Sequence, residues 1–471
     1  MKRPTLHVIF IFAPALVLST PASAQQPYYH KPLPAVERVL ESPPFPSVWL
    51  SPARDVLLIA PRPGPPPLAE LAAPRLKLAG VRVNPMTNGP HRAPYWLGLT
   101  VKRLDSGVER RVALPDTVRV GNPLWSADGK RVAFTGTTKD GMDLWVLDVD
   151  RATARHIPGV RLNGALGWTL LWMPDQRALL VKLVPSDRGA PPPDPAVPTG
   201  PDVQEASGKH GIGSTYERRD VLENAHDEDL FEYYGTAQLA FVDSETGAVT
   251  RFAKPDLFGS VQPSPDGQHF IVERIHRPYS HLHPWWRFPR EVEIWGRNGI
   301  LEHSLASLPL ADQVPIEGVP TGPRYYQWQP NRPATLVWVE ALDGGDPKAK
   351  VPQRDRVLTW DAPFSGQAAE ALRLKERFNS IAWTDSAGIA LIEQYDPERR
   401  WLTTYEEDLS VSGGAPRVIW DMSTNERYKD PGTPLLRPMA NGFYVLDRDG
   451  ATIYLAGAGA SPGGDRPFLD R

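Results

Sequence analysis

Cysteine is absent from all 471 residues of this chain. The protein therefore has no disulfide bond, no thiol nucleophile or ligand, and no lipid-modified cysteine that could anchor it. An excess of one charge is missing too, because the formal net charge is −3 and the isoelectric point is about 6.4. This balance gives no electrostatic reason to expect a nucleic-acid partner.

Long apolar runs are also missing, apart from a short one near the N-terminus. Two basic residues precede the apolar run at 6–18, which is too short to span a bilayer with margin, and small residues follow at Ala22–Ser23–Ala24. We therefore expect a secretory signal peptide at 1–24, cleaved between Ala24 and Gln25. The mature protein would be periplasmic or secreted by a bacterium, with no membrane association. An uncleaved anchor is the alternative.

The stretch 122–150 shows how the chain is organised. An apolar segment closes on Trp125, a tight turn follows at Ser126–Gly129, and two further β-like segments follow at Arg131–Phe134 and Asp143–Asp148. Glycine accepts the positive φ that a hairpin turn requires, so an Asp-Gly pair between two β-rich runs predicts a turn. The stretch predicts a three-stranded antiparallel meander.

This arrangement of a turn followed by an apolar strand recurs, giving about seven units that are mostly some 45 to 90 residues apart. The 52 prolines and 38 glycines fit many turns between short strands, and a tryptophan precedes most of the turns, as expected of core residues between neighbouring sheets. We predict an all-β fold, a β-propeller of about seven blades, closed or left incomplete and open, with long loop insertions. The other turns are Ser51–Arg54, Pro174–Gln176, Ser264–Gly267, Pro330–Arg332, Thr384–Ser386 and Asn441–Gly442.

Residues outside this repeat divide the chain further. We expect an N-terminal proline-rich arm at 25–46 and the propeller at 47–471, with insertions at about 61–95, 185–234 and 276–289. Insertions of this length in a compact fold are usually functional or mobile. The first contains LAELAAPRLKLAG, whose leucines at 68, 71, 76 and 78 predict one side of a short helix broken by a proline.

The sequence offers little that points to catalysis. We recognise no G-x-S-x-G nucleophile elbow, no H-E-x-x-H, no P-loop and no dinucleotide fingerprint. Ser214, in Gly211–Ser214, lacks the strand-then-helix context that exposes a nucleophile. We therefore expect no catalytic residue and no cofactor in this chain.

Two clusters of potential metal ligands are present. His281 and His283 would lie on one side of a strand, but no third ligand can be placed, and imidazoles hydrogen-bonded in a rim loop are the alternative. Asp227, Asp229 and Glu232 could bind a cation or an amino group, yet they lack the spacing of a calcium loop and fit a solvated or salt-bridged turn better. We expect no metal site.

Two arginines of the 276–289 insertion are candidates for binding an anion. Arg277 and Arg287 could each hold a carboxylate with two hydrogen bonds where they reach a pocket. The alternative is that each pairs with a nearby acid or stacks on Trp285 or Trp286, and this structural use is the more common one.

Several segments resemble a known family. The chain is similar, in order and over essentially all of its mature length, to the N-terminal propeller of the glutamyl endopeptidases, serine peptidases of the prolyl oligopeptidase group. The matching strings are PPPLAELAAPRLKLAGVRVNPMTN, SDRGAPPPDPAVPTGP, DEDLFEYY, HRPYS with RFPREVEIW, LDGGD and GASPGGDRPFLD. In that family the propeller precedes an α/β-hydrolase domain with a Ser-Asp-His triad, and it restricts access so that only peptides reach the active site.

The resemblance implies a non-catalytic propeller that gates a peptide substrate, with the hydrolase domain missing from this chain or supplied by another. The chain stops at Arg471, before the propeller would close and before any hydrolase domain, so we expect a truncated, split or partial product that is inactive alone. Cleavage after glutamate needs a group that binds its carboxylate, and the resemblance makes Arg277, Tyr279 and Arg287 candidates. The alternatives are a stand-alone periplasmic scaffold that binds a protein or peptide, and a propeller enzyme with its site at the channel mouth.

Overall fold

The computed structural model describes residues 32–195, 219–411 and 416–471. The predicted cleavage site at Ala24 and Gln25 and the segment Gly211–Ser214 lie outside the described residues. The chain divides into two units, Met1–Pro43 and Pro44–Arg471. Of the first unit the structure describes helix α1 (Pro34–Leu40), which begins with a proline in its first turn.

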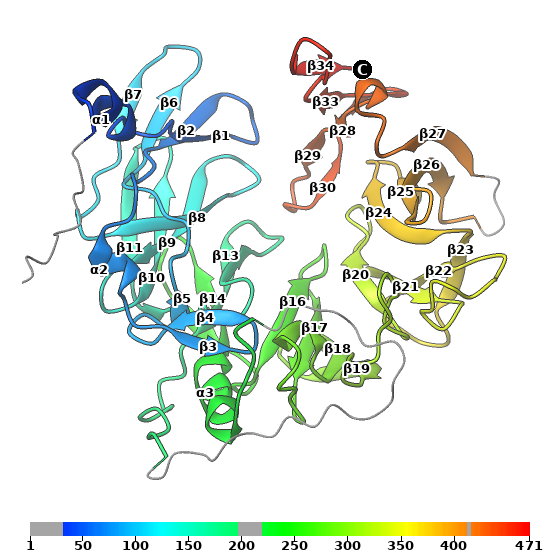
Figure 1. Cartoon of the computed structure of the whole chain (residues 1–471), viewed down its shortest axis with the longest axis horizontal. Helices are drawn as coiled ribbons and strands as arrows, with labels where there is room; N and C mark the ends of the chain where they lie inside the picture. Colours follow the sequence, from blue (N-terminus) through cyan, green and yellow to red (C-terminus); the bar gives the residue numbers. More distant parts are fainter. Residues whose placement is uncertain (1–31, 196–218, 412–415) are drawn as a thin grey trace, which may run out of the picture. The chain divides into compact units, whose positions relative to one another are not determined.

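The second unit is built mainly from four-stranded antiparallel sheets (Figure 1). Within each of these sheets, every strand pairs with the strand of that sheet that comes next in the sequence. Sheet one contains β1 (Ser47–Leu50), β2 (Val56–Ala60), β6 (Thr100–Arg103) and β7 (Glu109–Arg111). Sheet two contains β8 (Arg119–Trp125), β9 (Arg131–Thr137), β10 (Met142–Asp148) and β11 (Thr153–Arg161). Sheet three contains β12 (Leu170–Trp172), β13 (Ala178–Leu183), β14 (Gln238–Asp243) and β15 (Val249–Arg251).

Three more sheets repeat the same order. Sheet four contains β16 (Phe258–Pro263), β17 (His269–Ile275), β18 (Arg290–Gly296) and β19 (Leu301–Leu308). Sheet five contains β20 (Arg324–Trp328), β21 (Thr335–Ala341), β22 (Asp355–Asp361) and β23 (Ala369–Leu374). Sheet six contains β24 (Arg377–Trp383), β25 (Ile389–Asp396), β26 (Trp401–Asp408) and β27 (Arg417–Ser423).

The last segment, after the short helix η2 (Arg427–Lys429), is less regular. Its strands form small sheets in the orders β28-β33-β34, β29-β30 and β31-β32 instead of one four-stranded sheet. Among the described residues, no strand of this segment pairs with a strand of the first blade. The predicted propeller of about seven blades is therefore confirmed as six regular blades and one irregular, with an open arrangement. The strands are β28 (Thr433–Pro434), β29 (Leu436–Pro438), β30 (Tyr444–Leu446), β31 (Arg448–Asp449), β32 (Thr452–Ile453), β33 (Leu455–Gly457) and β34 (Phe468–Asp470).

The predicted tight turns form in the way their sequence suggests. Ser126 donates through Oγ to Asp128 Oδ1 at 2.6 Å and accepts from the backbone N–H of Arg131 at 3.0 Å, while Gly129 adopts a φ of +70°. The same bonds and a positive-φ glycine recur in Ser264–Gly267. The turn and its strands β8, β9 and β10 confirm the predicted meander.

Most of the hydrophobic core lies between neighbouring blades, since five clusters of buried side chains each draw on adjacent sheets. Val56 and Leu58 of the first blade pack with Val132 and Phe134 of the second, and the later clusters continue in chain order. Two of the recurring tryptophans, Trp172 and Trp328, also join blades by a hydrogen bond. The indole N–H of Trp172 donates to a backbone oxygen of the second blade at 3.0 Å, and that of Trp328 does the same to the fourth.

The long insertions all leave the propeller on one face. They join the second and third strands of blades one, three and four, and LDGGD does so in blade five, whereas the tight turns join first and second strands. Because neighbouring strands are antiparallel, these two kinds of connection lie at opposite ends of the sheets. We call the end that carries the insertions the insertion face. The described residues contain no helix long and apolar enough to cross a membrane.

The first insertion differs from its prediction. Helix α2 (Leu68–Leu71) is a single turn, and the leucines at 76 and 78 lie instead in β3 (Leu76–Leu78), which pairs with β4 (Val81–Asn84), itself paired with β5 (Gly89–Pro90). The hairpin turns at Ala79 and Gly80, both with positive φ. A leucine spacing that suits a helix was overridden by this turn and by a proline that the helix cannot contain.

Candidate functional site

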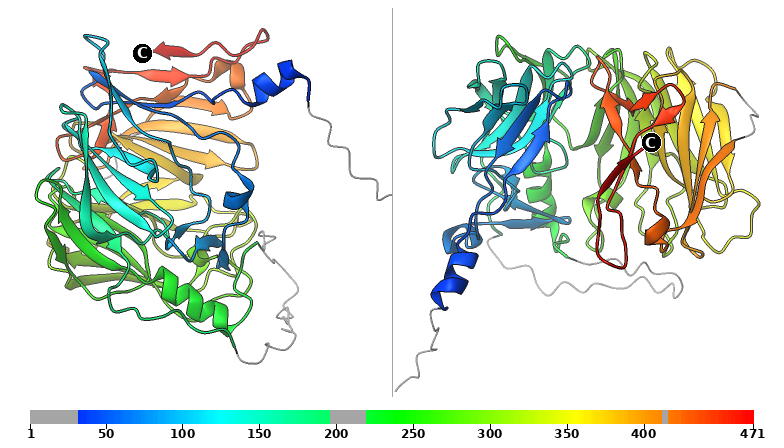
Figure 2. Two further views of the ribbon diagram at one scale, coloured as in Figure 1. Left: turned by 90° about the vertical axis from the view of Figure 1, so that its left-hand side faces the viewer. Right: turned by 90° about the horizontal axis from the view of Figure 1, so that it is seen from above.

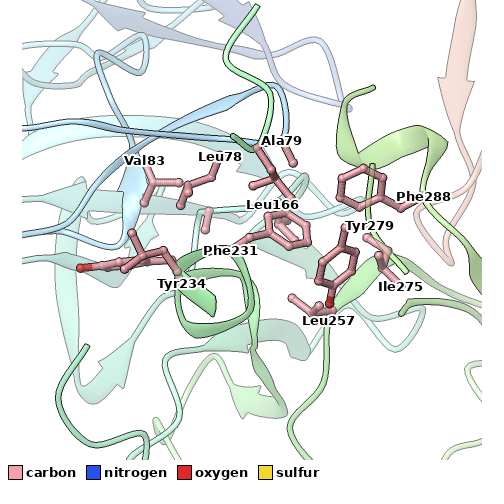
Figure 3. Close-up of a cluster of buried hydrophobic side chains, with 13 residues drawn as sticks. Leu78, Ala79, Val83, Leu166, Phe231, Tyr234, Leu257, Ile275, Tyr279 and Phe288 are labelled. Atoms are coloured by element: carbon pink, nitrogen blue, oxygen red, sulfur yellow. The ribbon is translucent and has the colours of Figure 1, made fainter. Parts of the chain in front are cut away.

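The three insertions share a hydrophobic core, which we call the insertion cluster (Figure 3). Phe231 lies at its centre, with ring centroids 5.2 Å from Tyr279 and 5.6 Å from Phe288, while Leu78 and Ala79 come from the hairpin of the first insertion. Segments that are far apart in the sequence therefore meet on the insertion face. Helix α3 (Ala225–Gly235) lies beside β3 in both orientations (Figures 1 and 2).

Helix α3 carries the acidic string of the second insertion. Asn224 caps the helix: its side-chain oxygen accepts a hydrogen bond from the backbone N–H of Asp227 at 3.0 Å. The acids in the first turn also stabilise the helix, because their negative charge interacts favourably with the positive end of the helix dipole. Leu230, Phe231 and Tyr234 are buried on one side of the helix. The predicted turn was wrong, because these acids lie in a capped helix, but Asp229 and Glu232 do form salt bridges, as that prediction allowed.

Arg277 lies against these acids. Its Nε is 2.7 Å from Glu232 Oε1 and its Nη2 is 3.2 Å from Asp229 Oδ1, and Nη1 pairs with Glu228. The hydrogen bond to Glu232 is the largest of the effects that raise the pKa of the guanidinium. Since three carboxylates already surround it, the structural role foreseen for Arg277 fits better than capture of a substrate carboxylate.

Tyr279 is the second predicted residue of this loop. Its side chain is buried in the insertion cluster and its hydroxyl donates to Glu232 Oε1 at 2.8 Å. Burial is the main cause that raises the pKa of the phenol, followed by this hydrogen bond. Tyr279 and Arg277 therefore share one acceptor and fix α3 to the loop.

Two histidines of the loop, His276 and His281, have carboxylate neighbours, and His283 is buried. His281 Nε2 lies 2.9 Å from Glu228 Oε1, and His276 Nε2 lies 3.3 Å from Glu291 Oε1. Within residues 32–195, 219–411 and 416–471 we find no group of three or more histidine, aspartate or glutamate side chains placed to hold a metal ion.

Arg287 lies elsewhere, in the wall of a cavity of about 620 Å³ between blades four and five, which we call the arginine pocket. The pocket is lined by the end of the 276–289 loop, by the connection 309–323 and by the inner strands β16 and β20. Its charged lining residues are three arginines, Arg287, Arg290 and Arg324, and one carboxylate, Glu273. Most of the remaining wall is apolar or aromatic.

Each of these arginines is held by a different element. Arg287 donates through Nη1 to the backbone oxygen of Ala311 at 2.9 Å, which ties the loop to the 309–323 connection. Arg290 pairs through Nη1 with Glu273 Oε2 at 3.1 Å, and Arg324 pairs with Asp355. The walls of the pocket are therefore fixed by ion pairs and backbone contacts before any ligand binds.

The LDGGD string forms one edge of the pocket. Asp343, with a fully buried carboxylate, accepts from Arg377 Nη2 at 2.6 Å and from Arg354 Nη1 at 2.9 Å, and it caps the backbone N–H of Gly345 at 3.0 Å. The oxygen of Gly345 in turn accepts from the backbone N–H of Val319 at 3.1 Å. A buried charge network thus connects blades five and six and positions the wall of the pocket.

Comparison with known proteins identifies the relatives of this propeller. "Probable glutamyl endopeptidase, chloroplastic" of Oryza sativa subsp. japonica is 35% identical in an alignment over 465 residues that covers 94% of this chain and 49% of the relative. The Arabidopsis thaliana protein of the same name is 34% identical over 465 residues, again 94% of this chain and 48% of the relative. The chain is a propeller related to the glutamyl endopeptidases. It spans about half the length of the curated relatives it matches.

Some solved structures are similar to parts of this chain, whereas no known protein-family profile matches it. The acylaminoacyl peptidase of Pyrococcus horikoshii is 13% identical with a TM-score of 0.42, covering 91% of this chain and 51% of that chain. The β-propeller domain of the Trilobed protease from Pyrococcus furiosus, described as having an open velcro topology, is 11% identical with a TM-score of 0.41, covering 91% and 94%.

The residues predicted for this glutamyl endopeptidase relative separate into two places. Tyr279 belongs to the insertion cluster and Arg277 pairs with the acids of α3, while Arg287 lines the arginine pocket. Sequence reasoning missed Arg290 and Arg324. Arg290 stands in the string RFPREVEIW beside Arg287, which was a usable signal, whereas Arg324 comes from the next blade and only the fold brings it close.

One motif was overlooked. Gly459–Gly463 reads GASPG and does match G-x-S-x-G, so the prediction that the pattern is missing was wrong. Ser461 nevertheless lies in a turn, where its hydroxyl donates to the backbone oxygen of Gly464 at 2.6 Å, and a strand, β34, follows instead of a helix. A nucleophile elbow requires a strand-to-helix turn, so this match does not form one.

Proposed function

We propose that this chain is the substrate-access propeller of a serine peptidase of the prolyl oligopeptidase family that resembles glutamyl endopeptidase. The propeller itself performs no chemistry, and peptide bonds are hydrolysed by an α/β-hydrolase domain outside these 471 residues. The observation that carries the proposal is the similarity over 94% of the chain to proteins named glutamyl endopeptidase that are about twice as long.

The geometry supports this role. The insertions cover one face of the propeller, where they form a common core, and the arginine pocket opens among them. A binding surface assembled from loops on a rigid scaffold is the usual arrangement for substrate recognition. The opposite end of the blades carries short turns, which leave less surface for recognition.

The first test uses the purified chain alone. It is incubated with a fluorogenic peptide that has glutamate before the scissile bond and with a fluorophosphonate probe for activated serine. We expect neither turnover nor labelling. Labelling of Ser461 or of another serine, together with turnover, would contradict the proposal.

The second test asks whether the chain can serve as a gate. The matched region of the rice relative is replaced by residues 47–471, and the chimera is assayed with short glutamate peptides and with casein. We expect peptides to be cleaved much faster than casein. A folded chimera that cleaves both equally, or neither, would favour a stand-alone scaffold that binds a protein or peptide.

We also propose export to the bacterial periplasm through the segment 1–24. The basic start, the short apolar run and the small residues before Gln25 support it. Cell fractionation of the expressed protein, with N-terminal sequencing, tests the proposal, and a cytoplasmic protein that keeps its first residues would refute it. The named relatives are chloroplastic, so the periplasmic location proposed for this chain differs from the location of those relatives.

A further inference from the structure

We propose that a groove on the insertion face, formed by the first insertion and by blades two and three, binds the main chain of an extended, uncharged peptide segment. The inference rests on the proposed function, because it adds a second site for the peptide to the same face. This groove shares no lining residue with the arginine pocket. We call it the threonine groove, after the six threonines that line it, Thr87, Thr117, Thr135, Thr137, Thr138 and Thr169.

The shape of the threonine groove suits an elongated ligand. Its volume is about 930 Å³, and its walls include the first insertion, the connection 116–118 before β8 and the turn 138–140 between β9 and β10. A cavity of about 390 Å³ adjoins the groove and shares Pro90, His91 and Gly167 with it. The two cavities together therefore offer a path long enough for several residues of an extended chain.

Two threonines carry hydrogen-bonding groups that the protein itself does not use. Thr135 on β9 and Thr169 just before β12 line the groove and are only 2% and 6% exposed. Neither hydroxyl forms a hydrogen bond with another described residue. Since buried polar groups nearly always have a partner, a ligand that takes the place of solvent water can bind to both hydroxyls.

His91, which lines both cavities, adds a third group of this kind. Its Nε2 is buried and meets no partner in the described part of the chain. Burial is the main cause that lowers the pKa of the imidazole, followed by the charge of Arg75, so the ring is uncharged at pH 7. A neutral imidazole nitrogen, like a threonine hydroxyl, suits an uncharged polar partner.

The charges around the groove also favour an uncharged ligand. Three basic and three acidic side chains line it. Four of them form two ion pairs, in which Glu70 Oε2 lies 3.2 Å from Arg119 Nη1 and Lys139 Nζ lies 2.7 Å from Asp140 Oδ1, and the other two have opposite signs. A charged side chain of a ligand would meet no excess of the opposite charge, whereas main-chain amide groups need none.

Two residues of the groove hold an unusual backbone conformation. Arg92 has a φ of +57° and Asn122 a φ of +47°, although neither is glycine. Asn122 is exposed and lies in β8 where the register with β9 shifts between Gly121 and Leu124. Bulges and left-handed residues concentrate at functional sites, because the surrounding structure must hold them against their cost. The bulge places the Asn122 carboxamide, which both donates and accepts, in the wall of the groove.

The lining favours a peptide main chain over a sugar. Hydroxyl and carboxamide groups each donate and accept, so they match the alternating N–H and C=O groups of an extended backbone. A sugar also offers hydroxyls, but its ring packs best on the open face of an aromatic side chain. Apart from His91, Tyr95 is the only aromatic residue among the described lining residues, and the Arg119 guanidinium covers its ring at 4.5 Å from the centroid.

The test compares two fluorescein-labelled octapeptides of alanine, serine and threonine, identical except that three central backbone nitrogens of one are methylated. Binding to the full chain is measured by fluorescence anisotropy. We expect the unmethylated peptide to bind about tenfold more tightly, because methylation removes main-chain donors. Unlabelled chitohexaose should not displace it. Equal binding of the two peptides, no binding of either, or displacement by the sugar would each overturn the proposal.

Two substitutions separate binding from folding. Thr135→Val and Thr169→Val remove a hydroxyl with little change of shape, so each should weaken binding of the unmethylated peptide about fivefold. Neither should lower the melting temperature, because no hydrogen bond within the described chain is lost. Thr153→Val, at an exposed position of β11, is the matched control and should change neither quantity. Unchanged binding in both groove variants, or a loss of stability that parallels the loss of binding, would refute the site.

The proposed function is judged separately, by the chimera with the rice relative. If the groove binds the peptide as expected while the chimera fails to gate, the peptidase role is rejected and the groove remains. If the chimera gates while Thr135→Val and Thr169→Val bind the peptide normally, the groove alone is rejected.

Discussion

Arg54, in the turn between β1 and β2, forms an ion pair with Asp447 of the last segment. The pair connects the first blade to the last, where the described strands form no shared sheet. The Arg54 side chain is 56% exposed, and an ion pair at such a site contributes about 1 kcal/mol or less. The contact between the ends of the propeller is therefore weakly held.

The weak closure leaves β34 with an unpaired edge, so we expect the isolated chain to self-associate. Leu469 on this strand is 69% exposed. Light scattering across a concentration series should show oligomers that Leu469→Lys reduces, because charge on an edge strand opposes pairing. Val108→Lys, at an exposed position of blade one, is the control. A monomer at every concentration, with one sharp unfolding transition, would contradict this.

The two glycines of LDGGD give a matched pair for the wall of the pocket. Both have positive φ, but a Cβ on Gly344 would meet nothing within 4 Å, whereas one on Gly345 would lie 2.0 Å from the backbone oxygen of Val319. We expect Gly344→Ala to cost about 1 kcal/mol of unfolding free energy and Gly345→Ala roughly 3 kcal/mol, since it adds a clash with backbone. Denaturant unfolding measures both, and equal effects would refute the close approach.

The buried network around Asp343 should be costly to break. Asp343→Asn leaves Arg377 and Arg354 with one negative charge fewer in an enclosed site, and we expect a loss of about 3 kcal/mol. Arg373→Gln removes a partly exposed ion pair with Glu370, three residues earlier on the same strand β23, and should cost less than about 1 kcal/mol. Thermal unfolding of the two variants compares them, and a similar small change in both would show that the network is not a structural requirement.

Local sequence patterns were sufficient to predict the blades of the propeller, but they were insufficient to predict which residues meet at the candidate site. The turn at Ser126–Gly129 could be predicted from its local sequence, because its hydrogen bonds join residues at most five positions apart. Helix α3 was missed although Asn224 and the acids after it are a capping signal. The meeting of Phe231 with Phe288, and of Arg287 with Arg324 around one pocket, depends on how the blades stack, which no local pattern encodes.

Lys182 gives a prediction about pH. It is buried in β13, where Nζ donates to the backbone oxygen of Leu166 and lies 5.2 Å from the centroid of the Trp168 ring. Desolvation lowers the pKa of the ammonium group to about 7. An unfolded lysine titrates near pH 10.5, so between about pH 7 and 10.5 the unfolded chain binds more protons. Stability should therefore rise with pH through this window.

Lys182→Met tests this. Removing a buried charge should increase the free energy of unfolding at pH 7 by roughly 1 to 3 kcal/mol, because the lost bond to Leu166 offsets part of the gain. Between pH 7 and 9.5 the unfolding free energy of the original chain should climb more steeply than that of the variant, by about 1.4 kcal/mol per pH unit. Lys102→Met, at a partly exposed site on β6, controls for the loss of a lysine at pH 7 and should change stability by about 0.5 kcal/mol or less. Parallel pH curves for the Lys182 variant and the original chain would show that the amine of Lys182 stays protonated in the folded chain through this pH range, as an exposed lysine does.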